Sequence, residues 1–160
     1  MSESEIASRP SVRLNSEETW DLIRESHTGI FTTLKRDGMP ISLPVWFIVL
    51  DNTIYIRTGG RKLQRLEHDP RCGFLVESGL KWAELRSVHI TGRAEFVERT
   101  PDFDARFTAE NERKYDPFRS ARSAMPATTR EHYEATQQFI VRIVPDARIL
   151  TWDNRKLQVI

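Results

Sequence analysis

From Gly29 onward the chain alternates between apolar and polar residues, and this period of two is the feature that most limits its fold. Turn-forming residues interrupt the alternation at intervals of about ten residues, a spacing typical of small barrels and sandwiches. One such turn is Asp37-Gly38, whose residue types tolerate the positive φ of a tight hairpin. The predicted strands cover residues 28–35, 41–50, 53–58, 72–77, 88–96, 138–144 and 148–152. We therefore expect a mainly β fold.

Two of the predicted strands differ in the polarity of their faces. Strand 41–50 has apolar residues on both faces, so we expect it to lie centrally in the sheet or beneath a ligand. Strand 88–96 is small and apolar on one face only. Its other face carries His89, Thr91, Arg93 and Glu95. We expect that polar face to meet water or another surface.

The N-terminal region predicts one helix. Asn15 followed by Glu18 is a capping-box pattern, which indicates a helix over residues 16–26. Residues 1–14 are polar, and we interpret them as a flexible arm in front of a single domain, 15–160.

Two further helical regions interrupt the strands. A short helix is expected over residues 61–68. Residues 101–136 also have a helical period, broken at Pro117 and Pro126, which indicates an excursion out of the sheet rather than a second domain. Its basic residues include Arg106, Arg113, Lys114, Arg119 and Arg122. Acidic residues between them favour a solvated helical face, and the alternative is a groove for an anionic substrate.

Composition excludes several classes of protein. A formal net charge of +1 argues against a dedicated nucleic-acid binder. Cys72 is the single cysteine, which favours a reducing compartment, and we expect a cytoplasmic protein. We expect no membrane association, because no apolar run reaches the ~20 residues of a membrane span. The four histidines lack metal-ligand spacing, so no metal site is expected.

The segment Thr58-Gly59-Gly60-Arg61-Lys62 joins a predicted strand to a predicted helix. The first N–H groups of a helix lack partners within it and lie at the positive end of its dipole, so this position attracts anions. Glycines let a phosphate approach the backbone, and the two basic side chains supply positive charge. The segment alone is either a phosphate-binding turn or a solvated helix start.

The surrounding sequence favours the phosphate interpretation. Residues 44–47 (Pro-Val-Trp-Phe) and 54–71 resemble the FMN-binding core of the pyridoxamine 5'-phosphate oxidase-like family. In that family a strand ends in Thr, a Ser/Gly-Arg-Lys turn binds the FMN phosphate, and an Asn/Asp-Pro-Arg turn follows the next helix. The resemblance covers residues 29–97, with a shorter match over 151–157. It implies an α+β fold, an antiparallel split β-barrel of about six to eight strands with short flanking helices.

The resemblance also implies the roles of individual residues. Arg61 and Lys62 would bind the cofactor phosphate, with hydrogen bonds from Thr58 and the backbone of Gly60. The residues implied to line the isoalloxazine ring or the ribityl chain are Val45, Trp46 and Arg57. The tail residues implied to reach the site from the other subunit are Trp152, Arg155 and Lys156. We therefore expect a homodimer with its cofactor sites at the subunit interface.

The C-terminal tail differs from that of the true oxidase. The oxidase carries an Arg-x-His pair that binds pyridoxal, whereas residues 155–160 contain no His. We expect little pyridoxamine-phosphate oxidase activity and a place among the flavin- or F420-dependent reductases of this fold. No nucleophile–base pair is apparent, and a flavin would itself carry the chemistry. The predicted function is an FMN-dependent oxidoreductase that transfers hydride or electrons to an unknown small molecule.

Alternatives stay open at the level of the sequence. The chain could instead be an F420H2-dependent reductase on the same fold, or a flavin- or haem-binding protein without enzymatic activity. Trp46 is equally interpretable as a core residue. Trp152 is also interpretable as a cap on one end of the barrel.

Overall fold

The computed structural model describes residues 10–158. Within that range the strands are β1 (Gly29–Leu34), β2 (Pro40–Val45), β3 (Ile48–Leu50), β4 (Thr53–Gly59), β5 (Arg71–Ser78), β6 (Arg86–Phe96), β7 (Gln138–Pro145) and β8 (Leu150–Asp153). The α-helices are α1 (Ser16–Glu25), α2 (Gly60–His68), α3 (Pro101–Tyr115) and α4 (Ala127–Ala135). Short 3₁₀ turns are η1 (Trp82–Glu84), η2 (Asp116–Phe118), η3 (Arg122–Ala124) and η4 (Asn154–Leu157).

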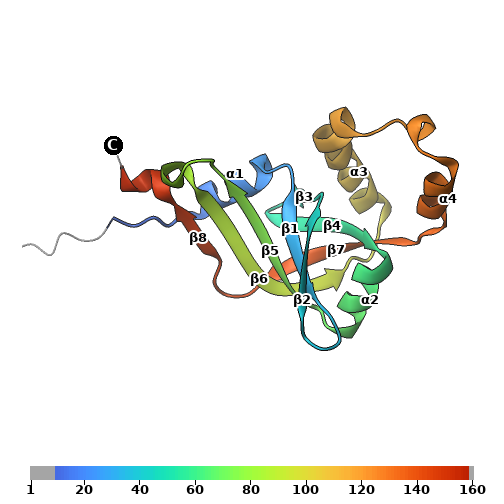
Figure 1. The fold of residues 1–160 in the computed structure, drawn as a ribbon, viewed down its shortest axis with the longest axis horizontal. Helices are drawn as coiled ribbons and strands as arrows, with labels where there is room; N and C mark the ends of the chain where they lie inside the picture. The colour runs from blue at the N-terminus through green and yellow to red at the C-terminus, as the bar shows by residue number, and fades with distance from the viewer. Residues whose placement is uncertain (1–9, 159–160) are drawn as a thin grey trace, which may run out of the picture.

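The strands form one antiparallel, strongly curled sheet (Figure 1). Its order is β2-β1-β5-β6-β7-β4-β3, and β8 pairs with the first part of β6. The two edge strands, β2 and β3, are consecutive in the chain and only Trp46 and Phe47 separate them. The sheet therefore curls until its edges meet through a covalent link instead of ladder hydrogen bonds. This is an α+β split β-barrel, as the sequence predicted.

The barrel interior is filled by alternate residues of the strands. Ile56, Phe74, Val88, Ile90 and Val141 are fully buried there. The predicted inward face of β6 is confirmed from Val88 to Ala94, where buried positions alternate with exposed or half-buried polar ones, but it is wrong at Phe96, which is 44% exposed. Helix α1 closes one side of the barrel with its buried apolar residues, Leu22 and Ile23.

The predicted capping box of α1 is present. The side chain of Asn15 accepts a hydrogen bond from Glu18 N at 2.9 Å, and the Glu18 carboxylate accepts one from Asn15 N at 2.8 Å. These two bonds fix the start of α1 beside the barrel.

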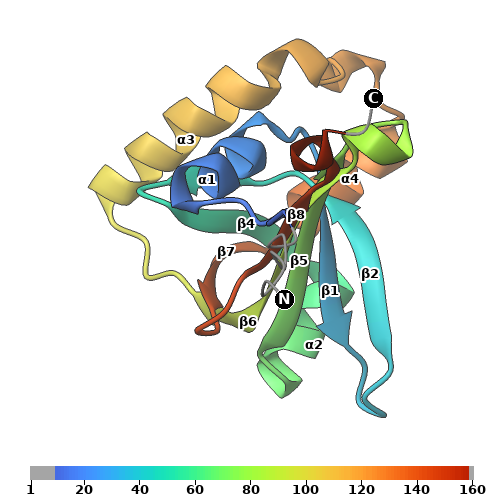
Figure 2. The same cartoon turned by 90° about the vertical axis from the view of Figure 1, so that its left-hand side faces the viewer.

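The excursion between β6 and β7 is also confirmed. Helices α3 and α4 stand to one side of the sheet in Figure 1, and α3 crosses above α1 in Figure 2. The breaks fall at the prolines, because η2 contains Pro117 and α4 begins after Pro126. A small second core joins α3 to the sheet through Ile48, Phe107, Tyr115 and Ile140.

The predicted single strand over residues 41–50 is wrong. The chain leaves the ladder at Trp46 and Phe47, and the two halves go to opposite edges of the sheet as β2 and β3. Phe47 N and O bind the side chain of Tyr115 rather than a neighbouring strand. The predicted central position is also wrong, because β2 pairs with β1 alone and is largely exposed.

The described end of the N-terminal arm contacts the C-terminal segment. Leu14 N donates to Thr151 Oγ1 at 3.0 Å, and Asp153 N donates to Val12 O at 2.7 Å. Residues 1–9 of the predicted arm lie outside the described residues. Among the described helices, none combines the length and the apolar character needed to cross a membrane.

Candidate functional site

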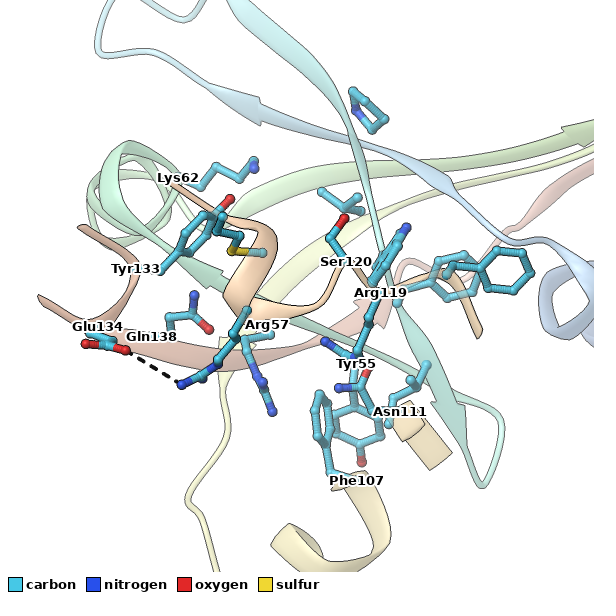
Figure 3. Close-up of a pocket in the computed structure, with 18 of the residues that line it drawn as sticks. Tyr55, Arg57, Lys62, Phe107, Asn111, Arg119, Ser120, Tyr133, Glu134 and Gln138 are labelled. Atoms are coloured by element: carbon cyan, nitrogen blue, oxygen red, sulfur yellow. Dashed lines mark ion pairs between the residues drawn. The ribbon is translucent and has the colours of Figure 1, made fainter. Parts of the chain in front are cut away.

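A cleft of about 770 Å³ lies between the barrel and the excursion (Figure 3). This volume is within the range of ~300–1,000 Å³ usual for small-molecule and cofactor sites. The barrel contributes Pro44, Val45, Trp46, Phe47, Ile48, Tyr55, Arg57, Lys62 and Gln138. The excursion contributes Phe107, Asn111, Phe118, Arg119, Ser120, Arg122, Met125, Arg130, Tyr133 and Glu134. Four of the sequence-predicted residues, Val45, Trp46, Arg57 and Lys62, are therefore brought together in one cavity.

Strand β4 sends its side chains alternately to the core and to the cleft. Tyr55 and Arg57 line the cleft. Thr58 shares the inward face with the buried Ile54 and Ile56. The Thr58 hydroxyl is buried and has no hydrogen-bond partner among the described residues. A buried hydroxyl without a partner costs free energy, so its position beside the Gly-Gly turn calls for an explanation.

The turn before α2 has the features of an anion site. Gly60 has φ +57, and a Cβ added there would meet nothing within 4 Å, so the backbone is open to a ligand. The residue before the helix, Gly59, has no side chain to cap it, and the first turn of α2 carries no acidic residue. Lys62 lines the cleft, whereas Arg61 is exposed outside its lining. Free amides and two cations fit the requirements of a phosphate.

An aromatic clamp holds the end of β2 against the excursion. The ring of Trp46 stacks on the ring of Tyr115 with centroids 4.3 Å apart and planes 4° apart. The Tyr115 hydroxyl accepts a hydrogen bond from Phe47 N at 2.8 Å, and Phe47 O lies 2.7 Å away as an acceptor. Burial raises the pKa of Tyr115 to about 12, so it stays a neutral donor. Trp46 is 39% exposed, which rules out a core role and places it on the cleft wall.

Lys114 reinforces the same clamp. Its ammonium lies 3.6 Å from the centroid of the Phe47 ring and donates to Phe47 O at 3.1 Å. Burial, together with the positive charge of Arg113, lowers the pKa of Lys114 to about 8 despite the opposing effect of Glu110. The clamp thus couples the position of α3 to the backbone of Phe47, between β2 and β3, where the two edges of the sheet meet.

Positive charge dominates the lining of the cleft. The basic residues are Arg57, Lys62, Arg119, Arg122 and Arg130. Glu134 is the one carboxylate among the lining residues, and it lies 3.7 Å from Arg122 (Figure 3, dashed line). Such a surface attracts anionic ligands.

The tail residues are not part of this cleft within one chain. Strand β8 and η4 lie at the opposite end of the molecule from α4 (Figure 1). Arg155 forms an ion pair of 2.6 Å with the buried Asp153. Lys156 contacts Glu18 at 2.7 Å, and Trp152 is 36% exposed.

The charge pattern of residues 101–136 favoured a solvated helical face over the alternative of a groove, so the contribution of α3 to the site was not predicted. Tyr115 and Phe107 form part of the buried contact of the excursion with the sheet, and neither belongs to a recognisable motif. The four-residue spacing of Phe103 and Phe107 was the available signal, because it places both rings on one helix face. It indicates packing, and it does not indicate a cleft.

Comparisons with known proteins agree with this fold. The family model of pyridoxamine 5'-phosphate oxidase matches residues 16–139. The structure of the conserved protein Rv2991 from Mycobacterium tuberculosis is 29% identical, with a TM-score of 0.77 over 95% of this chain and 92% of that one. A FAD-binding protein from Mesorhizobium loti is 15% identical, with a TM-score of 0.63 over 86% and 94% of the two chains. The heme storage protein HutZ from Vibrio cholerae is 13% identical, with the same TM-score and coverage.

One curated relative is also similar in sequence. The chain is 30% identical over 122 residues to the chloroplastic magnesium-chelatase subunit ChlI of Nicotiana tabacum. The match covers 76% of this chain but only 28% of that subunit, so it assigns none of the subunit's activity to the chain. The family model, in contrast, spans most of the chain, including β1 to α4 and the Gly-Gly turn. The chain therefore belongs to the pyridoxamine 5'-phosphate oxidase family.

Proposed function

We propose that this protein binds FMN by its phosphate and works as an oxidoreductase that transfers hydride or electrons to a small molecule. The observation that carries the proposal is the open, basic Gly-Gly turn at the start of α2, next to a cleft that Lys62 lines. The cleft offers both a charged end for a phosphate and aromatic walls for a planar ring.

The residues of the turn would hold the phosphate through complementary contacts. The first amides of α2 lack an intrahelical partner, and the helix dipole adds positive potential there. Arg61 can form a bidentate contact, and Lys62 can add a point charge. The resemblance also implies a hydrogen bond from Thr58, but its hydroxyl is buried on the inward face of β4 and outside the cleft lining, so we assign it no contact with the phosphate.

Val45 and Trp46 would orient the ring system, with Arg57 beside it on β4. The bound flavin supplies the hydride or electron transfer, while the protein supplies binding, orientation and electrostatics. Trp46 is well suited to orientation because its ring is fixed by stacking on Tyr115. No acid or base in the protein is then required by the transfer itself.

Two other cofactors remain candidates on specific grounds. The three arginines that the excursion adds to the cleft, Arg119, Arg122 and Arg130, suit the anionic tail of F420. The similarity to HutZ raises haem binding without enzymatic activity. The absorbance spectrum of the purified protein separates these cases, with bands expected at ~450 nm for FMN and at ~420 nm for F420, and a Soret band for haem.

The phosphate anchor is tested by fluorescence titration with FMN. Arg61→Ala and Lys62→Ala should each weaken FMN binding roughly ten- to a hundredfold, because each removes a charge-assisted contact worth about 1.5–3 kcal/mol. Lys35→Ala and Arg36→Ala are matched controls, since this basic pair is exposed in the β1–β2 turn and outside the cleft. Equal FMN affinity in all four variants would remove the basis of the proposal.

We further propose a homodimer in which the tail of each subunit completes the partner's cleft. Within one chain the cleft is open and the tail lies far from it, so a second subunit could close it. Mixing inactive Lys62→Ala chains with inactive Trp152→Ala chains should then restore one intact site per heterodimer. A monomer by sedimentation, or heterodimers that recover nothing, would contradict the shared site.

A further inference from the structure

More than half of the arginines in residues 10–158 have a carboxylate partner. Arg142, for example, lies 2.7 Å from Glu95, and Arg106 lies 2.8 Å from Asp51. Among the arginines of the cleft, Arg57 and Arg130 have no such partner within that range, and Arg119 is paired through Nε alone. Arg57 has no ion pair or side-chain hydrogen bond with any residue from 10 to 158, and its guanidinium carbon lies 5.1 Å from the Phe107 ring centroid.

Arg119, unlike Arg57, has a carboxylate partner. Its Nε lies 3.2 Å from Asp116, and both side chains of that pair are largely exposed. Its guanidinium carbon lies 5.6 Å from the centroid of the Trp46 ring. The planar group is therefore held against the cleft wall, and its terminal nitrogens have no partner in the described part of the chain.

The two guanidinium groups influence each other electrostatically. Partial burial, with the positive charges of Arg99 and Arg119, lowers the pKa of Arg57 from its usual value, and Asp104 offsets this only in part. Positive charges gathered at this end of the cleft raise the free energy of the empty site, because the one carboxylate among the lining residues, Glu134, pairs with Arg122. A bound anion would remove this repulsion and gain charge-assisted hydrogen bonds.

The phosphate turn and these arginines lie in different parts of the cleft. Lys62 is seen near Tyr133 in Figure 3, on the opposite side of the cleft from Phe107 and Asn111. A phosphate at the start of α2 would therefore leave the Arg57 end free for another negative group. Two aromatic rings lie against these arginines, Phe107 beside Arg57 and Trp46 beside Arg119, and Phe118 also lines the cleft.

We infer that Arg57 and Arg119 form a second subsite, which binds the carboxylate of a planar aromatic acid beside the cofactor. The inference rests on the proposed function, since it assigns the Lys62 end of the cleft to the FMN phosphate. A guanidinium fork matches a carboxylate in geometry, and exposed aromatic faces favour a planar ring next to it. Phe118, at 61% exposure, is a large apolar surface that such a ring would cover.

Calorimetric titration in a chloride buffer free of phosphate and carboxylates tests the subsite. Benzoate should bind the FMN-loaded protein at least about tenfold more tightly than its neutral analogue benzamide. Arg119→Gln and Arg57→Gln should each weaken benzoate binding about tenfold or more. Arg106→Gln removes the same charge from α3 outside the cleft and should leave benzoate affinity unchanged.

Parallel titrations with FMN keep the two hypotheses apart. Arg119→Gln should retain FMN affinity within about threefold, while Lys62→Ala loses it. A protein that binds benzoate through Arg119 but fails to bind FMN would refute the proposed cofactor and support the arginine subsite. Equal affinities for benzoate and benzamide, unchanged benzoate affinity in both variants, or displacement of benzoate by FMN would each overturn the inference. Inorganic phosphate that binds Arg119 more tightly than benzoate would also overturn it.

Discussion

The hydroxyl of Tyr115 should be worth about 1.5–4.5 kcal/mol of stability, and Tyr115→Phe measures it. The substitution leaves the buried N–H of Phe47 without a partner, at a cost of about 1–3 kcal/mol, and removes one donated hydrogen bond worth about 0.5–1.5 kcal/mol. The Phe47 carbonyl still accepts a hydrogen bond from Lys114 in the variant, so no cost for an unpaired carbonyl is added. The ring that stacks on Trp46 is retained, which isolates the effect of the hydroxyl.

Urea unfolding and thermal melts followed by circular dichroism provide the assay. A loss of this size corresponds to a fall in Tm of roughly 3–18 °C for a domain of about this length. Tyr133→Phe is the matched control, since that side chain is 59% exposed, and its cost should stay under about 0.5 kcal/mol. If Tyr115→Phe lowers the free energy of unfolding by less than about 0.5 kcal/mol, this hydroxyl does not fix the backbone between β2 and β3.

Three further outcomes follow from the structure. In urea unfolding, Gly79→Ala should lower the free energy of unfolding by at least about 2 kcal/mol more than Gly60→Ala. A Cβ at Gly79 would overlap the carbonyl oxygen of Glu84, whereas a Cβ at Gly60 would meet nothing within 4 Å. The reverse ranking would contradict this. Thr58→Val should not destabilise the FMN-free protein, because it removes a buried hydroxyl without a partner. A loss of stability would show that the hydroxyl is already bonded. Burial lowers the pKa of Lys114 from 10.5 to about 8. Above about pH 8 the folded protein therefore binds fewer protons than the unfolded chain. The free energy of unfolding of the parent protein, relative to that of Lys114→Met, should consequently rise from about pH 8 to 10. A flat difference across that range would contradict the shift.

The parts of the fold that depend on local pattern were predictable from the sequence. The capping box at Asn15, the hairpin turn at Asp37-Gly38 and the breaks at Pro117 and Pro126 each act through a few neighbouring residues. The split of strand 41–50 was not predictable in this way. It depends on Tyr115, almost seventy residues further along the chain, which binds both backbone groups of Phe47 (|i−j| = 68).

The same distinction applies to the candidate site. The Gly-Gly turn is a local feature, and the structure places it at the start of α2 as predicted. The second wall of the cleft comes from the excursion, whose residues read as a solvated helical face when taken alone. Arg119 turns toward Trp46 only because the clamp at Tyr115 brings η2 against the barrel. A charge pattern cannot reveal which arginines have carboxylate partners in the folded chain.

The contacts of the tail decide which of its residues can serve a partner subunit. The Arg155 guanidinium holds the pKa of the buried Asp153 below its usual range, so removing Arg155 would leave that carboxylate unpaired and destabilise the residue's own chain. Lys156 is similarly engaged with Glu18 and with a backbone carbonyl. Within residues 10–158 the side chain of Trp152 has neither kind of contact, and it is partly exposed on β8. A substitution at Trp152 therefore tests the function of the tail without also unfolding its own chain. A complementation experiment built on Arg155 would instead report a loss of stability and not a shared site.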